Sequence, residues 1–296
     1  MEGGDHSPNA RHWLKISNCT SMRVDHCYFH HKETVGNFCI VGFKSDNNDG
    51  DGPIFEYNYF HHQDLDLRVK REDMGDAGGE AVRMGHSDMA RTNFRAIFRH
   101  NYLEECNCDG EIVTNKSCNN IYFNNAFTDC NGSLTLRHGH TTAVLGNYFK
   151  NCGLRVTGAH NLIANNLSTE NSREDNRRPL IIHNGKEDGD YGRVDKNHII
   201  LNTFVNGSGT ADTIVLWGAG NGSKEPTNNE FRGNIIIAKS GSLFKLNNSD
   251  SSNTINDNIA WITGDATLGD LSTQMATKID PLMTRADDGI YLLQTD

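Results

Sequence analysis

The chain has 296 residues, and its 28 Lys and Arg against 38 Asp and Glu give a formal net charge of −10. This length suffices for a continuous core, no apolar run approaches the about 20 residues that a membrane span needs, and no signal peptide opens the sequence. A net acidic chain argues against nucleic-acid binding, which needs a basic face, but allows an anionic polymer held by a few local cations. We therefore expect no nucleic-acid partner and no membrane partner.

A repeated phrase runs through the chain after a first strand-like stretch at residues 13–16, before which no capping helix is legible. The phrase is an Asn followed by aromatic or aliphatic residues, and it begins at Asn58, Asn101, Asn125, Asn147, Asn166, Asn202, Asn234 and Asn258. These positions are separated by 43, 24, 22, 19, 36, 32 and 24 residues. Short β-prone stretches such as 112–114, 134–136, 162–163 and 199–201 lie between the phrases.

The shortest common interval predicts the architecture. A period of about 22–24 residues is too short for ankyrin or tetratricopeptide units, and no 3.6-residue apolar stripe supports helices. The remaining solution is a right-handed parallel β-helix, in which short strands stack on the next coil about 4.8 Å along an axis. Asn at a fixed turn position tolerates a left-handed backbone and can hydrogen-bond its counterpart one rung away.

Cysteine spacing supports the same fold. Eight cysteines are present, none after Cys152, and Cys106, Cys130 and Cys152 each lie five residues after an Asn of the repeat. We expect buried thiols that stack in a ladder, together with Phe and Leu, in preference to disulfides.

The longer intervals and the two ends complete the domain prediction. Intervals of 43, 36 and 32 indicate coils with loop insertions near 63–78, 170–195 and 207–229. We expect one domain over residues 1–296, in which the segment 265–296 loses the Asn phrase and closes the C-terminal end.

The residues with the most evident potential for chemistry lie between 76 and 160. Lys116 and Arg137 are 21 residues apart, so a β-helix places them on adjacent rungs of one face, with Arg155 one rung further. Asp109 and Glu111 differ by two, which predicts that both point to the same side of one strand. The candidate set also contains Glu80, Arg83, His138 and His160.

This combination favours proton abstraction from a charged sugar. Glycoside hydrolysis needs two flanking carboxylates, and no tight acid pair is evident. A Lys beside Arg residues is poised as a base because its ammonium form is disfavoured, and cations can neutralise a uronate carboxylate. A base, an acid and a group that neutralises the carboxylate are together what β-elimination on a uronic-acid polymer requires. The alternative interpretation is that these residues are only solvated surface charges.

At these residues the sequence resembles polysaccharide lyase family 6, the family of alginate lyases and chondroitinase B. The resemblance spans about residues 10–292 and is sharpest at Gly-Gly-Glu-Ala-Val-Arg (78–83), Asn-Lys-Ser (115–117), Leu-Thr-Leu-Arg-His-Gly (134–139), Asp-Pro-Leu (280–282) and Asp-Gly-Ile-Tyr (288–291). It implies the same β-helix and makes Lys116 the base that removes the C5 proton. Arg137 would protonate the departing oxygen. In the same comparison Arg83, His138 and Arg155 would hold sugar carboxylates, and Glu80 would support the site.

Two departures from the family pattern concern calcium and the start of the chain. Family members commonly bind calcium beside the Lys, through an Asn whose position falls here on Ala77, or on Asp76 if the loop shifts. Asp109 and Glu111 are the candidate metal ligands, and we expect the calcium site to be weakened or absent. The family also has coils before residue 10, so we expect the N-terminal coils to be missing or shortened.

The leading hypothesis is an alginate lyase whose partner is an anionic polysaccharide. A dermatan- or chondroitin-type lyase and a non-catalytic carbohydrate-binding β-helix stay open as alternatives. A secreted or periplasmic location is inferred from the extracellular substrate alone. Block preference, endo or exo action and oligomeric state are not legible in the sequence.

Overall fold

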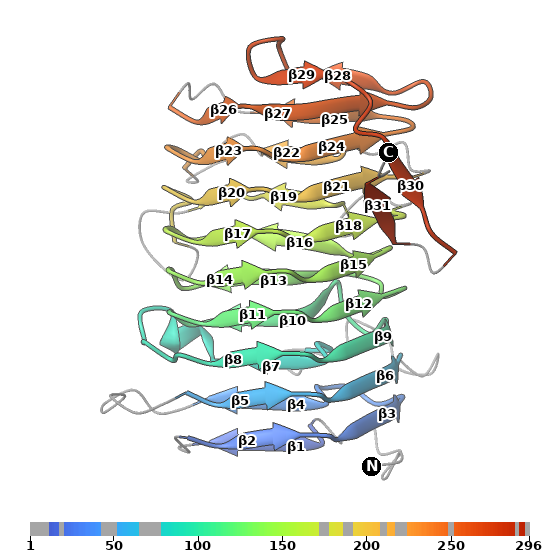
Figure 1. Ribbon diagram of the computed structural model, residues 1–296. Helices are drawn as coiled ribbons and strands as arrows, with labels where there is room; N and C mark the ends of the chain where they lie inside the picture. The colour runs from blue at the N-terminus through green and yellow to red at the C-terminus, as the bar shows by residue number, and fades with distance from the viewer. Residues whose placement is uncertain are drawn as a thin grey trace.

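A computed structural model describes residues 12–17, 21–42, 52–64, 78–171, 178–185, 192–207, 212–216, 224–247, 252–287 and 290–293. Its strands follow one another in coils that stack along a single axis, and each coil supplies strands to three long sheets (Figure 1). Every pairing within the three sheets is parallel, so the predicted parallel β-helix is confirmed. No helix in the described part of the chain is long and apolar enough to span a membrane.

The three sheets are named A, B and C here. Sheet A contains β1 (Leu14–Ser17), β4 (Cys39–Gly42), β7 (Val82–Met84), β10 (Glu111–Lys116), β13 (Ser133–His138), β16 (Gly153–Val156), β19 (Leu180–Ile182), β22 (Ile214–Leu216), β25 (Ser242–Leu246) and β28 (Thr267–Gly269). Sheet B contains β2 (Arg23–Asp25), β5 (Ile54–Glu56), β8 (Ile97–Arg99), β11 (Ile121–Phe123), β14 (Ala143–Leu145), β17 (Leu162–Ala164), β20 (His198–Ile200), β23 (Glu230–Arg232) and β26 (Thr254–Asn256). Sheet C contains β3 (Tyr28–Lys32), β6 (Tyr59–Gln63), β9 (Tyr102–Cys106), β12 (Ala126–Thr128), β15 (Tyr148–Lys150), β18 (Leu167–Thr169), β21 (Thr203–Asn206), β24 (Ile235–Ala238), β27 (Asn258–Ile262) and β29 (Ala276–Lys278).

Inward-pointing side chains form columns along the axis because the pairing keeps equivalent residues in register. In sheet C, Phe29 stacks on Phe60 with ring centroids 4.9 Å apart, and Phe127 stacks on Phe149 at the same distance. Leu103 occupies the rung between Phe60 and Phe127. All five side chains are buried, so the predicted apolar ladder is confirmed.

The Asn repeat forms a buried hydrogen-bonded ladder at the turn between sheets B and C. For example, Asn125 Oδ1 accepts hydrogen bonds from the backbone N–H and the side-chain amide of Asn101, at 3.0 and 3.1 Å. The prediction that the Asn itself is left-handed is wrong. The left-handed residue is the one before it, such as Asn124 at φ 52° or Leu201 at φ 56°, and the Asn side chain satisfies the backbone that this turn leaves unpaired.

A second Asn ladder, which the repeat analysis did not recognise, lies five residues earlier in the coil. The backbone N–H of Asn161 donates to Asn197 Oδ1 at 2.9 Å, and that of Asn197 donates to Asn229 Oδ1 at 3.1 Å. Asn229 continues the ladder to Asn253. This corner joins sheet A to sheet B.

The predicted thiol ladder is confirmed. The backbone N–H of Cys106 contacts Cys130 Sγ at 3.4 Å, and that of Cys130 contacts Cys152 Sγ at 3.2 Å. All seven described cysteines are free thiols, and Cys19 lies outside the described residues.

The predicted insertions lie partly outside the described residues. Residues 65–77, 172–177, 186–191, 208–211 and 217–223 are not described. The second and third of the long coils keep their sheet A strands, β19 and β22. The extra residues therefore lie before or after the strand and do not replace it.

The C-terminal segment adds β28 and β29 to the stack and then forms an antiparallel hairpin, β30 (Met283–Arg285) and β31 (Tyr291–Leu293). The hairpin lies beside the coils on the sheet C side (Figure 1). An ion pair between Arg285 and Glu170, the residue after β18, attaches it there.

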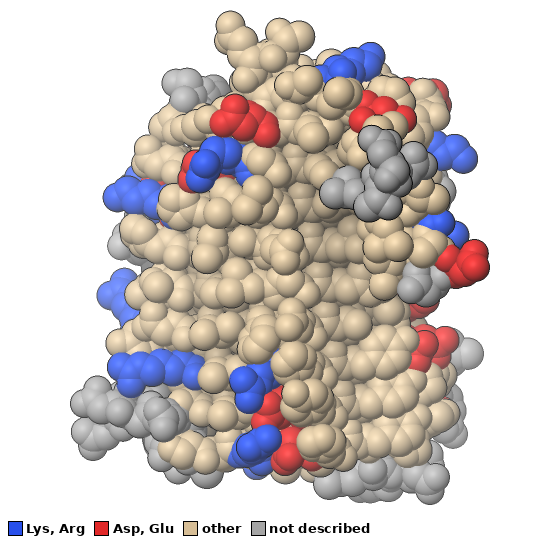
Figure 2. Space-filling view, in the orientation of Figure 1, with Lys and Arg blue, Asp and Glu red and all other residues tan. Residues whose placement is uncertain are grey.

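Charge on the face seen in Figure 2 is sparse and mixed. Lys and Arg lie beside Asp and Glu in small groups, separated by uncharged surface, and this face shows no broad basic area. Among the ion pairs of the described residues, buried Glu56 is paired with Arg23 and, at 2.6 Å, with Arg99. Pairing of this kind neutralises charge locally and does not attract a polyanion over a wide surface.

Candidate active site

The candidate site is built on four successive strands of sheet A, β7, β10, β13 and β16. Their register aligns Arg83 with Thr114, Thr114 with Thr135, and Thr135 with Arg155. The side chains of one such column point to the same face because strand side chains alternate. The two Arg residues therefore stand three rungs apart, with two small Thr side chains between them.

Lys116 does not pair directly with Arg137. Lys116 pairs with His138, and Asn115 pairs with Leu136, so Arg137 falls in a register shift between them. A bulge in β13 adds one residue that counting along the sequence does not reveal. Both still belong to adjacent rungs, and Arg137 is close enough to affect the ionisation of Lys116.

Glu80 fixes Arg83 at the β7 end of the site. It is 2% exposed, and it accepts hydrogen bonds from Arg83 Nε at 2.9 Å and Arg83 Nη2 at 2.7 Å. The Asn37 amide donates to Glu80 at 3.0 Å, and the Thr114 hydroxyl oxygen lies 3.3 Å from the same carboxylate. Burial acts to raise the pKa of Glu80, but the hydrogen bonds and charge of Arg83 outweigh it and hold that pKa below its usual value. Glu80 therefore stays ionised and fixes the Arg83 guanidinium.

Glu111 fixes Arg137 and Arg155, on β13 and β16, in the same way. Its carboxylate lies 3.2 Å from Arg137 Nη1 and 3.1 Å from Arg155 Nη2, and the Thr114 hydroxyl donates to it at 3.0 Å. Two cations from successive coils thus share one buried acid. The sequence analysis placed Arg137 and Arg155 on neighbouring rungs but found no sign that Glu111 joins them.

Lys116 lies within this charged cluster and is only 6% exposed. Burial lowers its pKa, and the positive charge of Arg83 and then of Arg137 lowers it further, whereas Glu80 and Glu111 act in the opposite direction. A lysine whose ammonium form is disfavoured supplies more neutral amine near neutral pH, which is the form that can accept a proton.

Three histidines that the sequence analysis did not select lie around the same cluster. Burial lowers the pKa of His86, and Arg83 and Lys116 lower it further. Burial likewise lowers the pKa of His183, where Arg155 adds to the effect, and it lowers that of His12 to about 4, with Arg83 contributing. His86 follows Arg83 by three residues, and His183 directly follows β19. A search for His just beyond the ends of the sheet A strands would therefore have found both.

Three other predicted residues lie in or next to the same sheet A strands. His138 is 2% exposed, aligned with Lys116, and its carbonyl accepts a hydrogen bond from the Asn115 amide at 2.9 Å. His160 is exposed in the turn after β16, and its side chain has no hydrogen bond or ion pair with the described residues. Asp109 lies in the bend before β10, since the strand starts at Glu111, so the prediction that both acids share one strand is wrong.

The described residues do not fit a calcium cage. Both oxygens of Glu111 already face guanidinium groups, and no group of three or more His, Cys, Asp and Glu among the described residues is arranged to hold a metal ion. Calcium prefers several oxygen ligands that are free to converge. Asp76 and Ala77, where the family pattern expects a ligand, lie outside the described residues.

The chain matches one family of known proteins. A family model described as Chondroitinase B matches residues 5–291. No curated protein sequence matches the chain.

Solved structures with the same fold include three polysaccharide family 6 lyases. One is a mannuronic acid specific lyase from human gut microbiota, with 24% identity and a TM-score of 0.67, for which the match covers 82% of this chain and 55% of that one. The alginate lyase AlyGC has 21% identity and a TM-score of 0.66, with coverage of 95% and 52%. A family 6 alginate lyase in complex with a trisaccharide has 17% identity and a TM-score of 0.73, with coverage of 96% and 65%. The chain thus spans about half the length of the first two, and identities this low show the fold.

Proposed function

The chain belongs to the chondroitinase B family, polysaccharide lyase family 6, and on that premise we propose that it cleaves alginate by β-elimination. The family was predicted from the motifs around Lys116 and Arg137, and that prediction is confirmed by the match over residues 5–291. The substrate, the chemical step and the residue roles are the proposal. A substrate of this kind lies outside the cell, so the proposal carries a secreted or periplasmic location with it.

One observation carries the proposal: a buried lysine in β10 has an arginine on each neighbouring strand, and two buried acids act on its charge. In the proposed step, neutral Lys116 takes the proton from C5 of a uronate unit. The electron pair forms the C4–C5 double bond, the C4–O bond breaks, and Arg137 protonates the departing oxygen. Arg137 suits this position because its side chain is one-third exposed, whereas Lys116 is almost covered.

Abstraction of a proton next to a carboxylate requires that its charge be neutralised. A guanidinium has five N–H donors, and Glu80 uses two of those of Arg83 while Glu111 engages one nitrogen of Arg155. Both Arg residues therefore keep donors for sugar carboxylates. Glu80 and Glu111 hold them in place, which saves the entropy of ordering two long side chains when the substrate binds.

The test is the ultraviolet absorbance of unsaturated uronate during incubation with alginate. We expect absorbance to rise with the unaltered protein and to fall by about 10²–10⁴-fold in rate in Lys116→Ala, the usual range for a general base. Lys150→Ala is the matched control, since Lys150 is paired with Asp129 on sheet C, away from the cluster, and should turn over normally. No rise with folded, unaltered protein would remove alginate as the substrate.

A second candidate is cleavage of dermatan or chondroitin sulfate. The observation that favours it is the name of the matching family model, Chondroitinase B. The same assay with dermatan sulfate in place of alginate separates the two. If neither polymer yields unsaturated product while both bind, the chain is a carbohydrate-binding β-helix.

A further inference from the structure

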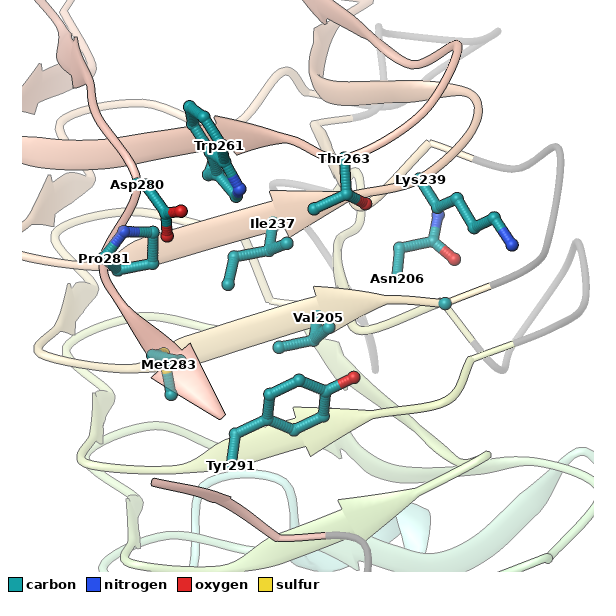
Figure 3. Close-up of a pocket in the computed structure, with 11 residues that line it drawn as sticks. Val205, Asn206, Ile237, Lys239, Trp261, Thr263, Asp280, Pro281, Met283 and Tyr291 are labelled. Atoms are coloured by element: carbon teal, nitrogen blue, oxygen red, sulfur yellow. The ribbon is translucent and has the colours of Figure 1, made fainter. Parts of the chain in front are cut away.

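A pocket of about 250 Å³ lies between sheet C and the C-terminal hairpin (Figure 3). It is lined by β21, β24 and β27 on one side and by Asp280, Pro281, Met283 and Tyr291 on the other. The Lys116 cluster is on sheet A, so the two sites belong to different sheets of the coil.

The floor of the pocket is a column of outward-pointing apolar residues. Val205 pairs with Ile237, and Ile237 pairs with Trp261, so the three side chains lie on consecutive rungs. Val205 and Ile237 are 3% and 6% exposed although their inward-pointing neighbours Phe204 and Ile236 fill the core. They are covered from outside by the hairpin, which the Arg285–Glu170 ion pair attaches to the coils.

Polar groups surround this apolar floor. In Figure 3 the indole nitrogen of Trp261 is on the side of its ring nearer Ile237, and the carboxylate of Asp280 faces the same space. One Asp280 oxygen accepts the backbone N–H of Leu282 at 2.8 Å, which leaves the other for a ligand. Within the described part of the chain, the indole N–H of Trp261 and the hydroxyl of Tyr291 have no hydrogen-bond partner.

We propose that this pocket binds one hexuronate unit of the acidic polysaccharide and so attaches the protein to its polymer away from the cleaved bond. The inference rests on the proposed function for the identity of the polymer. An apolar floor with amphipathic aromatic walls and a few hydrogen-bonding groups matches a sugar ring, which has apolar C–H faces and hydroxyl edges.

Size and charge narrow the ligand further. The pocket is smaller than the about 300–1,000 Å³ of sites for drug-sized molecules, so it holds one ring and not a longer segment. Lys239 is the one Lys or Arg among its lining residues, and in Figure 3 it stands at the edge with its ammonium extending away from Ile237, so an acidic sugar would meet it through a carboxylate at the rim of the pocket. Two motifs that the Lys116 cluster does not use, at 280–282 and 288–291, supply Asp280, Pro281 and Tyr291 to this pocket.

The experiment measures binding to intact alginate in the Lys116→Ala background, so that the polymer is not cut, by affinity gel electrophoresis and calorimetry. Trp261→Leu keeps an apolar side chain but removes the indole N–H, and Lys239→Met removes the cation. We expect each to weaken binding to the polymer by about tenfold, the effect of one lost charged or polar contact. Lys278→Met is the matched control: Lys278 is exposed on β29 outside the lining and should bind as the parent does.

A second readout separates this proposal from the proposed function. With Lys116 restored, Trp261→Leu and Lys239→Met should form unsaturated product from short oligosaccharides at the parental rate. Unchanged polymer binding in both variants overturns the pocket assignment, and equal affinity for a neutral polysaccharide overturns the hexuronate. If the unaltered chain forms no product but binding still depends on Trp261 and Lys239, the proposed function fails and the pocket stands.

Discussion

Lys116 faces His138 across the pairing of β10 with β13, and Arg137 occupies the register shift beside them. The shift releases Arg137 from the strict column, so its side chain is one-third exposed and still reaches Glu111 at 3.2 Å. The proposed base is therefore almost covered, while the proposed acid keeps contact with solvent, from which it can regain a proton.

The first prediction concerns the pH dependence of turnover. Lys116 acts as a base only when neutral, and its pKa is lowered below the ordinary 10.5. We expect kcat/KM for alginate to rise with pH through an apparent pKa below 10.5. In Glu80→Gln an acid that raises the Lys116 pKa is removed, so the rise should move to lower pH. A rise centred at or above 10.5 contradicts the assignment of the base.

The second prediction concerns Glu111 and stability. Glu111→Gln leaves Arg137 and Arg155 without their shared carboxylate, and we expect it to lower the free energy of unfolding by about 1–3 kcal/mol. Asp129→Asn is the control, because Asp129 is 45% exposed and its pair with Lys150 should contribute about 0–1 kcal/mol. Urea unfolding of the two variants measures the difference, and equal losses would show that Glu111 is not a buried anchor.

The third prediction concerns the Asn ladder. Asn125→Ala removes the acceptor of Asn101 and the donor to Phe98 and Asn147, which leaves buried backbone groups unpaired. We expect a loss of about 3 kcal/mol, because each unsatisfied buried group costs about 1–3 kcal/mol. Asn107→Ala is the comparison: its side chain makes no hydrogen bond to the described residues, and thermal unfolding should change little.

The fourth prediction concerns calcium. A calcium ion bound to Glu111 must displace two guanidinium groups, so we expect the rate of product formation to be unchanged by a chelator. The measurement is the alginate assay with and without chelator. Activity that is lost on chelation and restored by added calcium would contradict this expectation and direct attention to residues 65–77.

Much of the fold could be predicted because every coil of a solenoid must pair the same backbone groups, so the same residue types recur at the same positions. The Asn spacing and the fixed offset of Cys106 reported the strand stacking and the thiol ladder directly. The second ladder was also readable, since Asn161, Asn197 and Asn229 repeat the intervals 36 and 32 of the first ladder five residues earlier. It was missed because the residue directly after each Asn is Leu162, His198 or Glu230, which gives no common apolar phrase.

The site was less predictable because residue counts determine register only where neither strand bulges. Counting placed Lys116 and Arg137 on neighbouring rungs, but not the shift that pairs Lys116 with His138. The contact of Glu111 with Arg155 joins strands that are not adjacent, so it depends on side-chain length as well as on position. The hairpin over Trp261 follows from no repeat at all, since β30 and β31 lie outside the coil pattern.

The rungs that carry Arg83, Lys116, Arg137 and Arg155 are joined by parallel backbone pairing, whose step is about 4.8 Å. The spacing of these charged residues along the axis is therefore set by the backbone pairing and not by the side chains. An insertion widens a coil sideways but leaves the step unchanged. Substitution can change which rungs carry a charge. The distance from one rung to the next stays the same for any polymer that binds along the axis.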